Sequence, residues 1–340
     1  MKTGQQLFFS LLGTPSTQFV IPVYQRVYAW GSKQCDTLWN DILRAGQRNA
    51  PHFIGTVLIA EEESSSDRIR CIDIIDGQQR TATLTLIIAA LRDYLSERDL
   101  SIGNVDADYL DRTFLFSQDD DPCKLHLSSL DQATLRAVLN RSALPEEDDL
   151  SENVVANYRQ FRQKMKTDFD VATLWRGLNQ LLVIVANLDE DDRPQAVFES
   201  LNSKGMPLTT ADLARNLLFI GIGYDEQSRL YTQYWEPVEK LYENDGEAVS
   251  LNAALRGWLA IKAPHLHISD KDDVYAAFKN YLQNDYRGQT EELLRGLSGF
   301  LRTFAAKTQA AASGAHNDHM AWGTGGRTKG LLADRKLFGD

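Results

Sequence analysis

The stretch from residue 53 to residue 95 constrains the fold more than any other part of the chain. It begins with two segments rich in apolar and β-branched residues, "HFIGTVLIAEE" and "RIRCIDIID", separated by a hydrophilic turn. This pattern predicts a β-hairpin over residues 53–76. The following letters, "GQQRTATLTLIIAALRDYL", place leucine and isoleucine at helical spacing. Asp76 and Gly77 are therefore expected to form a strand-to-helix turn.

Other segments add helices and one more strand to this hairpin. "LNQLLVIVANL" (178–188) reads as a buried strand that joins the same sheet, and "FVIPVYQ" reads as extended. The residues before and after them predict an α+β fold, in which a small mixed sheet with helices is followed by a mostly helical part. Helices are expected at 5–12, at 32–46 with Ser32 as N-cap, at 151–169, on both sides of a glycine turn within 194–223, and throughout 224–310.

The same pattern gives a domain division. We expect a first domain at 1–222 with a helical insertion at about 100–175, then a helical domain at 223–315. Residues 316–340 lose periodicity and read as a linker or the start of a further domain.

Composition excludes several classes of protein. The chain has 47 acidic and 36 basic residues and a formal net charge of −11, which weighs against non-specific coating of nucleic acid but not against a local basic site. No apolar run approaches the roughly 18 residues of a membrane helix, and the N-terminus lacks a signal-peptide pattern. Three cysteines without paired spacing argue against a disulfide framework, so a reducing cytoplasm is expected.

The first chemistry-bearing motif is the turn "DGQQR", Asp76 to Arg80. An acid, a glycine, two amides and an arginine at a helix N-terminus offer free N–H groups and a positive dipole end, which together favour phosphate. Arg80 is a bidentate phosphate donor, Asp76 can hold Mg²⁺, and Gln78 or Gln79 can orient a water. The alternative is a capped helix with solvated polar residues.

The second motif is "FESLNSKGMPLTTADLARN", residues 198–216. Asn202, Lys204 and Gly205 lie in its turn, and Lys204 beside Gly205 can complete an anion site. A separate set on the following helix, Asp212, Arg215 and Asn216, shares one face by i, i+3, i+4 spacing. The alternative is a helical hairpin with a surface ion pair.

The third motif is "IPVYQRVYAW", in which aromatic residues alternate with Gln25 and Arg26. Such a segment can stack on bases or line an apolar pocket with a polar rim. For Tyr28 and Trp30 we favour core packing instead. For Gln25 and Arg26 core packing is the weaker explanation, because an embedded arginine needs an anion or a carboxylate partner.

Metal and hydrolase motifs are poorly supported. The pairs His316/His319 and His265/His267 lack further ligands at metal spacing, and no G-x-S-x-G, H-E-x-x-H or Walker-type glycine loop occurs.

Five motifs in this order carry a resemblance: "FVIPVYQRVYAW", "HFIGTVLI", "IIDGQQRTATLTLI", "NYRQF" and "FESLNSKGMPLTTADLARN". Over residues 7–220 the chain resembles the ParB-like nucleotide-hydrolysing N-terminal domain of GmrSD-type restriction systems. The spelling I-P-V-Y-Q-R is most similar to SspE-type effectors, which sense DNA phosphorothioation. The resemblance implies a ParB/sulfiredoxin-like α+β domain followed by a helical one.

The resemblance also implies a role in antiviral defence. It implies hydrolysis of GTP or ATP with Mg²⁺ at Asp76, and recognition of modified double-stranded DNA, phosphorothioate above all. An H-N-H-type nuclease domain, C-terminal or separate, would cut the DNA, whereas this chain alone is not expected to. The residues implicated are Asp76 as metal ligand; Gln78, Gln79 and Arg80 as catalytic groups; Gly77, Asn202, Lys204 and Gly205 in nucleotide binding; and Pro22, Val23, Tyr24, Gln25 and Arg26 in sensing.

Two alternatives stay open. One is a non-hydrolysing ParB-like adaptor, whose "DGQQR" turn grips backbone phosphate. The other is a nuclease proper. The preferred nucleotide, the DNA modification and the oligomeric state do not follow from the sequence.

Overall fold

The computed structural model divides the chain into two compact units, residues 1–233 and 234–340. It describes residues 2–61, 69–117, 123–146, 150–165, 169–188, 210–220, 222–243, 250–268 and 273–319. The sequence predicts a domain boundary after residue 222. The structure divides the chain one helix later, because helix α10 (Tyr224–Leu230) belongs to the first unit.

A six-stranded mixed sheet forms the base of the first unit, in the order β1-β6-β3-β4-β2-β5. β3 and β4 pair in antiparallel fashion and β6 joins β3 in parallel, so the predicted hairpin and the predicted third strand are confirmed. The α+β prediction is also confirmed. The strands are β1 (Lys2–Leu7), β2 (Thr17–Val20), β3 (His52–Glu61), β4 (Arg70–Asp76), β5 (Leu125–His126) and β6 (Leu181–Leu188).

The first helix expected from the sequence, at residues 5–12, is wrong in its first half. Residues 2–7 pair with β6 as an antiparallel edge strand, and only Phe8–Leu12 is helical. Sheet pairing has overridden the local pattern, because the long-range ladder satisfies the backbone of a segment with weak helical preference.

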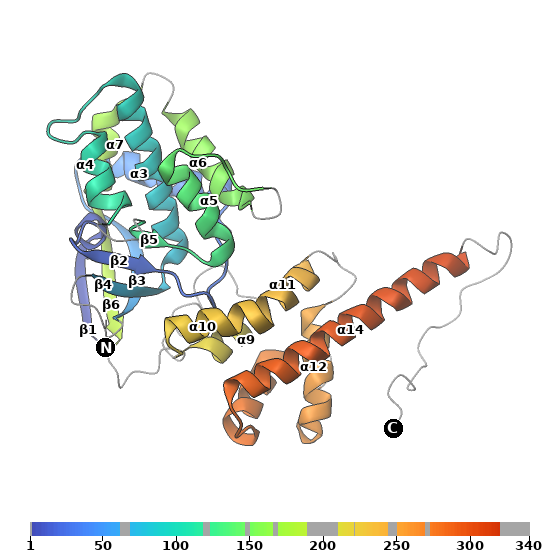
Figure 1. Cartoon of the computed structure of the whole chain (residues 1–340). Coiled ribbons are helices and arrows are strands. Elements are labelled where there is room, and N and C mark those ends of the chain that lie inside the picture. The colour runs from blue at the N-terminus through green and yellow to red at the C-terminus, as the bar shows by residue number, and fades with distance from the viewer. Residues whose placement is uncertain are drawn as a thin grey trace. The chain divides into compact units, whose positions relative to one another are not determined.

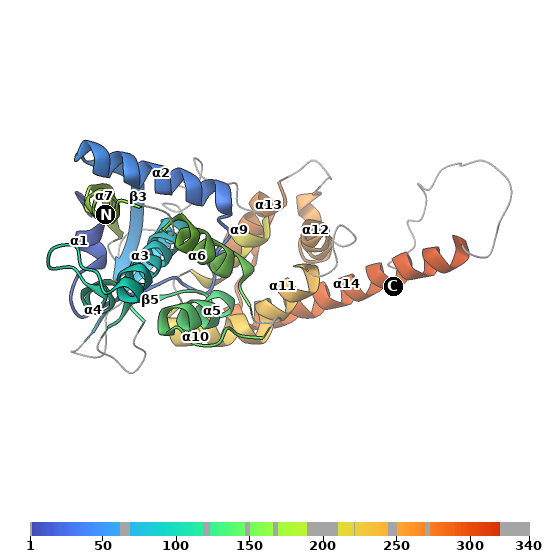
Figure 2. The same cartoon turned by 90° about the horizontal axis from the view of Figure 1, so that it is seen from above.

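Helices cover one face of this sheet, where α3, α5, α6 and α7 gather above the strands (Figure 1). α2 packs against α7 (Figure 2). Gly31, not Ser32, is the N-cap of α2, and its N–H donates to Gln34 Oε1 at 3.3 Å. The helical elements are α1 (Phe8–Leu12), α2 (Ser32–Arg48), α3 (Gln78–Arg98), α4 (Ala107–Leu110), the π-helical η1 (Asp111–Leu115), α5 (Ser129–Asn140), α6 (Glu152–Lys164), α7 (Val171–Leu178) and α9 (Thr210–Phe219).

Helix α3 is the centre of the first unit. Its apolar spacing predicts one buried face, yet every residue from Gln78 to Leu95 except Arg80 is buried. The buried polar side chains on it include Arg92, which pairs with Asp93 at 2.8 Å and Asp111 at 2.7 Å. A helix enclosed on all sides places its N-terminal turn in the interior as well.

All regular elements that the structure describes in the second unit are helical, as expected. Trp258 packs edge-on against Phe278 and Tyr281, which joins three of its helical elements. None of the described helices in the chain is both long and apolar enough to span a bilayer. After the π-helical η3 (Tyr231–Trp235), the helical elements are α11 (Glu236–Glu243), α12 (Leu251–Lys262), η5 (Pro264–Leu266), α13 (Val274–Asn280), η6 (Tyr281–Asp285) and α14 (Thr290–His319).

Strand β3 contains a bulge that faces α3. Its register against β6 shifts between Phe53 and Thr56, and Gly55 has φ +111°. The guanidinium of Arg80 donates to the carbonyl oxygens of Ile54 and Thr56, at 2.6 Å for the latter. A Cβ at residue 55 would lie 3.1 Å from Arg80 Cζ and closer still to Nη1. The glycine of the "HFIG" segment therefore makes room for the arginine of "DGQQR".

We expect Gly55→Ala to lower the free energy of unfolding by about 2–3 kcal/mol, because an L residue is strained at this φ and its methyl group displaces Arg80. Gly4→Ala in β1 is the control, since a Cβ there has open space. Urea denaturation measures both variants. Equal midpoints for Gly55→Ala and the wild type would contradict the bulge assignment.

Lys124 is a buried cation at the start of β5. It is 3% exposed, and its Nζ donates to the carbonyl oxygens of Thr14 and Thr113, each at 2.9 Å. Burial lowers the pKa of Lys124 from its ordinary 10.5 to about 8. Above that pH the neutral amine still has two N–H bonds for these two acceptors.

The stability conferred by Lys124 should rise with pH. Because the pKa of Lys124 is lower in the folded chain, the unfolded chain binds more protons between pH 8 and 10.5. The unfolding free energy of the wild type, relative to Lys124→Met, should therefore increase by about 2–3 kcal/mol across that window. Urea denaturation of both proteins at several pH values tests this, and parallel pH profiles would refute it.

Candidate functional site

The N-terminus of α3 lies at the end of β4, where a tight turn joins strand to helix. Gly77 is the N-cap with φ +97°, and no side chain caps the helix there. A Cβ on Gly77 would meet Val57 Cγ2 at 3.3 Å and Thr56 O at 3.4 Å, so a larger residue would push against β3. The turn therefore presents the positive end of a 21-residue helix without a resident capping oxygen from the N-cap side chain.

Asp76 and Arg80 lie on the side of this turn that faces β3. Burial raises the pKa of the Asp76 carboxyl, against the opposing influence of Arg80 and of the Gly77 N–H. Burial likewise lowers the pKa of Arg80, while the charge of Asp76 opposes that shift. The two charges are thus close enough to stabilise each other, and two carbonyl oxygens of β3 fix the orientation of the guanidinium.

The two glutamines of the motif point to the other side of the turn. Gln79 Oε1 accepts hydrogen bonds from the N–H groups of Ala29 at 2.8 Å and Trp30 at 3.2 Å, and its Nε2 donates to Val27 O at 3.1 Å. Gln79 is thus committed to holding the backbone of a neighbouring loop. Gln78 differs, because Nε2 donates to Gln25 Oε1 at 3.3 Å and no donor among the described residues reaches its Oε1.

The segment 21–30, called here the aromatic loop, has no helix or strand. Apart from the bond from Ile21 N–H to His126 O, which continues the β2–β5 ladder, its backbone groups are hydrogen-bonded largely by side chains from elsewhere. Gln79 makes three of these bonds. In addition, Arg215 Nε donates to Tyr24 O at 2.6 Å, and Tyr28 N donates to Asp131 Oδ2 at 2.6 Å. Two asparagines of α6 also donate to the loop, Asn153 Nδ2 to Tyr28 O at 3.2 Å and Asn157 Nδ2 to Trp30 O at 2.6 Å.

The structure places the predicted sensing residues mostly in the interior. Pro22, Val23, Tyr24 and Gln25 are buried, and Gln25 is 2% exposed. Only Arg26 among these five is half-buried. Tyr28 is buried as expected for a packing residue, with its hydroxyl 2.7 Å from Thr83 Oγ1 and 3.1 Å from Asn157 Nδ2. Trp30 packs partly against the same core.

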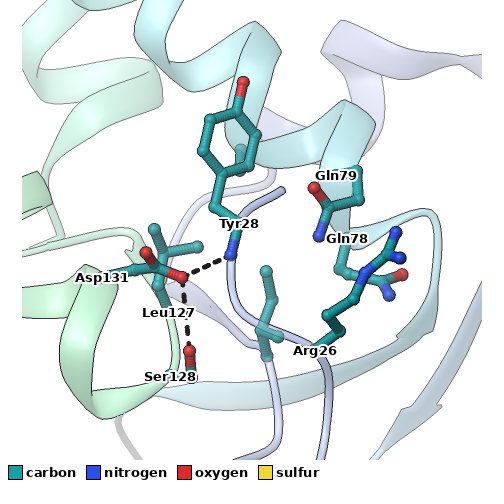
Figure 3. A pocket seen from close by; sticks show the side chains of 9 residues that line it. Arg26, Tyr28, Gln78, Gln79, Leu127, Ser128 and Asp131 are labelled. Atoms are coloured by element: carbon teal, nitrogen blue, oxygen red, sulfur yellow. Dashed lines mark hydrogen bonds between the residues drawn. The ribbon is translucent and has the colours of Figure 1, made fainter. Parts of the chain in front are cut away.

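A small pocket lies between the aromatic loop and the first turn of α3. Figure 3 shows Arg26 and Gln78 on one side of it, and Asp131 with Ser128 on the other. Its cavity volume is about 10 Å³, which is room for about one water molecule. A space of this size does not enclose a nucleotide or a phosphate group. Its lining residues are Ile21, Arg26, Tyr28, Gln78, Gln79, Ala82, Leu127, Ser128 and Asp131.

Asp131 is a site residue that the sequence analysis missed. It is 2% exposed and accepts hydrogen bonds from Tyr28 N–H and from the Ser151 hydroxyl at 2.5 Å. Burial raises its pKa, and these donors oppose the shift. The spacing from Ser128 to Asp131 matches a capping box, which could have located the start of α5 but not the contact with the aromatic loop.

On α9, Asp212, Arg215 and Asn216 share one face, as predicted. Arg215 Nη2 lies 2.8 Å from Asp212 Oδ1, and Asn216 Nδ2 donates to Asp212 O at 2.9 Å. The alternative of a surface ion pair is wrong, because the three residues are 3–6% exposed. Asn202, Lys204 and Gly205, also predicted at this site, lie outside the described residues.

Comparison with known proteins identifies the family. The sequence profile of the GmrSD restriction endonuclease N-terminal domain matches residues 8–219. No curated protein matches the chain. The matched span contains the α3 turn, the aromatic loop and α9. The chain therefore belongs to the family of GmrSD restriction endonuclease N-terminal domains, components of restriction systems that act on modified DNA.

Proposed function

We propose that this chain is the nucleotide-hydrolysing sensor of an antiviral restriction system. The observation that carries the proposal is the first turn of α3, which has no N-cap side chain and lies between Asp76 and Arg80 on one side and Gln78 and Arg26 on the other. Free N–H groups at a helix N-terminus bind phosphate, and Arg80 adds positive charge beside them. The nucleotide, GTP or ATP, would place its phosphates at this turn.

Asp76 fits the role of a Mg²⁺ ligand. Among the described residues no group of three or more His, Cys, Asp and Glu side chains is placed to share a metal. Mg²⁺ does not need such a group, since it is commonly held by one or two carboxylates, substrate phosphates and water. Burial raises the pKa of Asp76, and the charge of Arg80 and the Gly77 N–H oppose that shift. When bound, the ion would neutralise charge on the phosphates.

Gln78 is the better candidate for orienting the attacking water. Gln78 is 7% exposed, and no described residue donates to its Oε1, whereas both amide atoms of Gln79 bind the aromatic loop. We therefore assign Gln79 a structural role beside the site. Asn202, Lys204 and Gly205 stay proposed nucleotide contacts on their motif alone.

Recognition of modified DNA is assigned to Arg26, which is half-buried beside the small pocket. A phosphorothioate keeps its negative charge but is larger and less hydrated at sulfur, so it suits a cation beside apolar walls. Arg26 supplies the cation, and Ile21, Ala82 and Leu127 supply apolar lining. Pro22 to Gln25 would act indirectly, by fixing the position of Arg26. An H-N-H-type nuclease domain, C-terminal or separate, would then cut the DNA.

One observation favours the non-hydrolysing adaptor as a second candidate. The side chains of Gln79 and Arg80 are occupied by backbone carbonyl and N–H groups of the chain itself. A turn whose side chains are occupied in this way can still grip a DNA phosphate through its backbone N–H groups. In that case, excess nucleotide should compete with DNA and no turnover should occur.

Asp76→Asn should lower phosphate release about 10²–10³-fold, because it removes the proposed metal ligand. The fold should survive, because asparagine keeps the size of Asp76 and Arg80 keeps its bonds to two carbonyl oxygens of β3. Release from GTP and from ATP is measured with phosphorothioated and unmodified duplexes, and Asp36→Asn on α2 is the control. Wild-type turnover in Asp76→Asn would refute the site, and no turnover in the wild type would favour the adaptor.

Arg26→Met should abolish discrimination between phosphorothioated and unmodified DNA. The methionine keeps length and apolar contact but removes the charge at the pocket, so affinity for modified duplex should fall at least about tenfold. Arg44→Met, which removes an exposed cation on α2, is the matched control. Titration of both duplexes at two salt concentrations measures the effect. Retained preference in Arg26→Met would rule out this pocket as the sensor.

A further inference from the structure

Helix α9 is tied to the aromatic loop through one buried arginine. Arg215 is 4% exposed, and its Nε donates to Tyr24 O at 2.6 Å. Its Nη2 pairs with Asp212 at 2.8 Å, one turn earlier on the same helix. Two fixed bonds on one planar guanidinium set the position of the Tyr24 carbonyl relative to α9.

The next residue of the loop contacts the α3 turn from two directions. Gln25 Nε2 donates to Ile75 O at 3.0 Å, at the end of β4, and Gln25 Oε1 accepts from Gln78 Nε2 at 3.3 Å. These contacts flank Asp76 and Gly77. A displacement of the Tyr24–Gln25 peptide therefore alters the hydrogen bonding of the turn on both sides.

The buried ion pair is not explained by stability alone. A buried Arg–Asp pair loses hydration that its attraction only partly offsets, and apolar residues of similar size often stabilise a fold equally well. Arg215 does something that an apolar residue cannot, because it donates to a specific carbonyl of a loop that has no ladder of its own. Contacts therefore lead without a gap from Arg215 on α9 to Tyr24, along the chain to Gln25, and from Gln25 to Gln78.

We infer that Arg215 is a positioning residue that couples the aromatic loop and α9 to the α3 turn, acting through Tyr24 and Gln25 on Gln78. Its effect on turnover rests on the proposed hydrolytic function. The mechanical part, the dependence of the α3 turn on Arg215, does not. A DNA ligand that moves the aromatic loop would, by this route, change the orientation of Gln78.

The test uses the full chain with Asp212→Asn/Arg215→Gln, which removes both charges together and so avoids an unpaired buried carboxylate. Glu226→Gln/Arg229→Gln is the matched control, because it removes an exposed ion pair of the same i, i+3 spacing on α10. Arg215→Lys keeps the charge and one donor, and serves as the conservative variant. Amide hydrogen exchange is measured without ligand, and phosphate release with phosphorothioated duplex.

We expect amide hydrogen exchange in the double variant to be about tenfold faster at residues 24–30 and also at residues 77–80, with no such change in the control. We further expect that DNA-stimulated kcat falls about tenfold while KM for nucleotide changes less than about twofold, with partial recovery in Arg215→Lys. Faster exchange confined to α9 and residues 24–30 would overturn the coupling, as would unchanged kcat in an active enzyme. If the wild type shows no turnover, the proposed function fails, and the exchange at residues 77–80 alone decides the coupling.

Discussion

The aromatic loop is held in place by hydrogen bonds from side chains, and the site depends on this arrangement. A coil segment buried against a helix has backbone donors and acceptors that water cannot reach, and each must find a partner. Here Gln79, Asp131, Asn157 and Arg215 supply partners from four different helices. The backbone of the loop is therefore hydrogen-bonded without a full strand ladder, and several of its own side chains make further contacts in the interior. This explains why tyrosines, a glutamine and an arginine occur together in one short segment.

The enclosure of α3 follows from the same arrangement. A helix covered on every side has no solvated face, so polar residues along it must bind protein groups. Gln79 binds the aromatic loop, Thr83 binds Tyr28, and Arg92 binds two carboxylates. The N-terminal end of such a helix is largely shielded from water, and electrostatic attraction for an anion is stronger there than at a solvated helix terminus.

Local patterns predicted much of this fold, because the information lay within a few residues. The β3–β4 hairpin and the turn at Gly77 follow from alternation, helical spacing and a glycine. Long-range contacts were not predictable in this way. β1 forms because β6 pairs with it, and the link from Asp131 to Tyr28 spans 103 residues. Motif reasoning found the residues of the α3 turn, but it could not show that Gln78 and Gln79 have different partners.

The bulge in β3 has a consequence for how sequences of this kind can diverge. The space occupied by the Arg80 guanidinium exists only while position 55 lacks a side chain, and the carbonyls beside Gly55 lose their donor if Arg80 is replaced. Neither position can therefore drift alone without passing through a less stable intermediate. Positions 55 and 80 should behave as one evolutionary unit, so that relatives lacking one of these residues also lack the other.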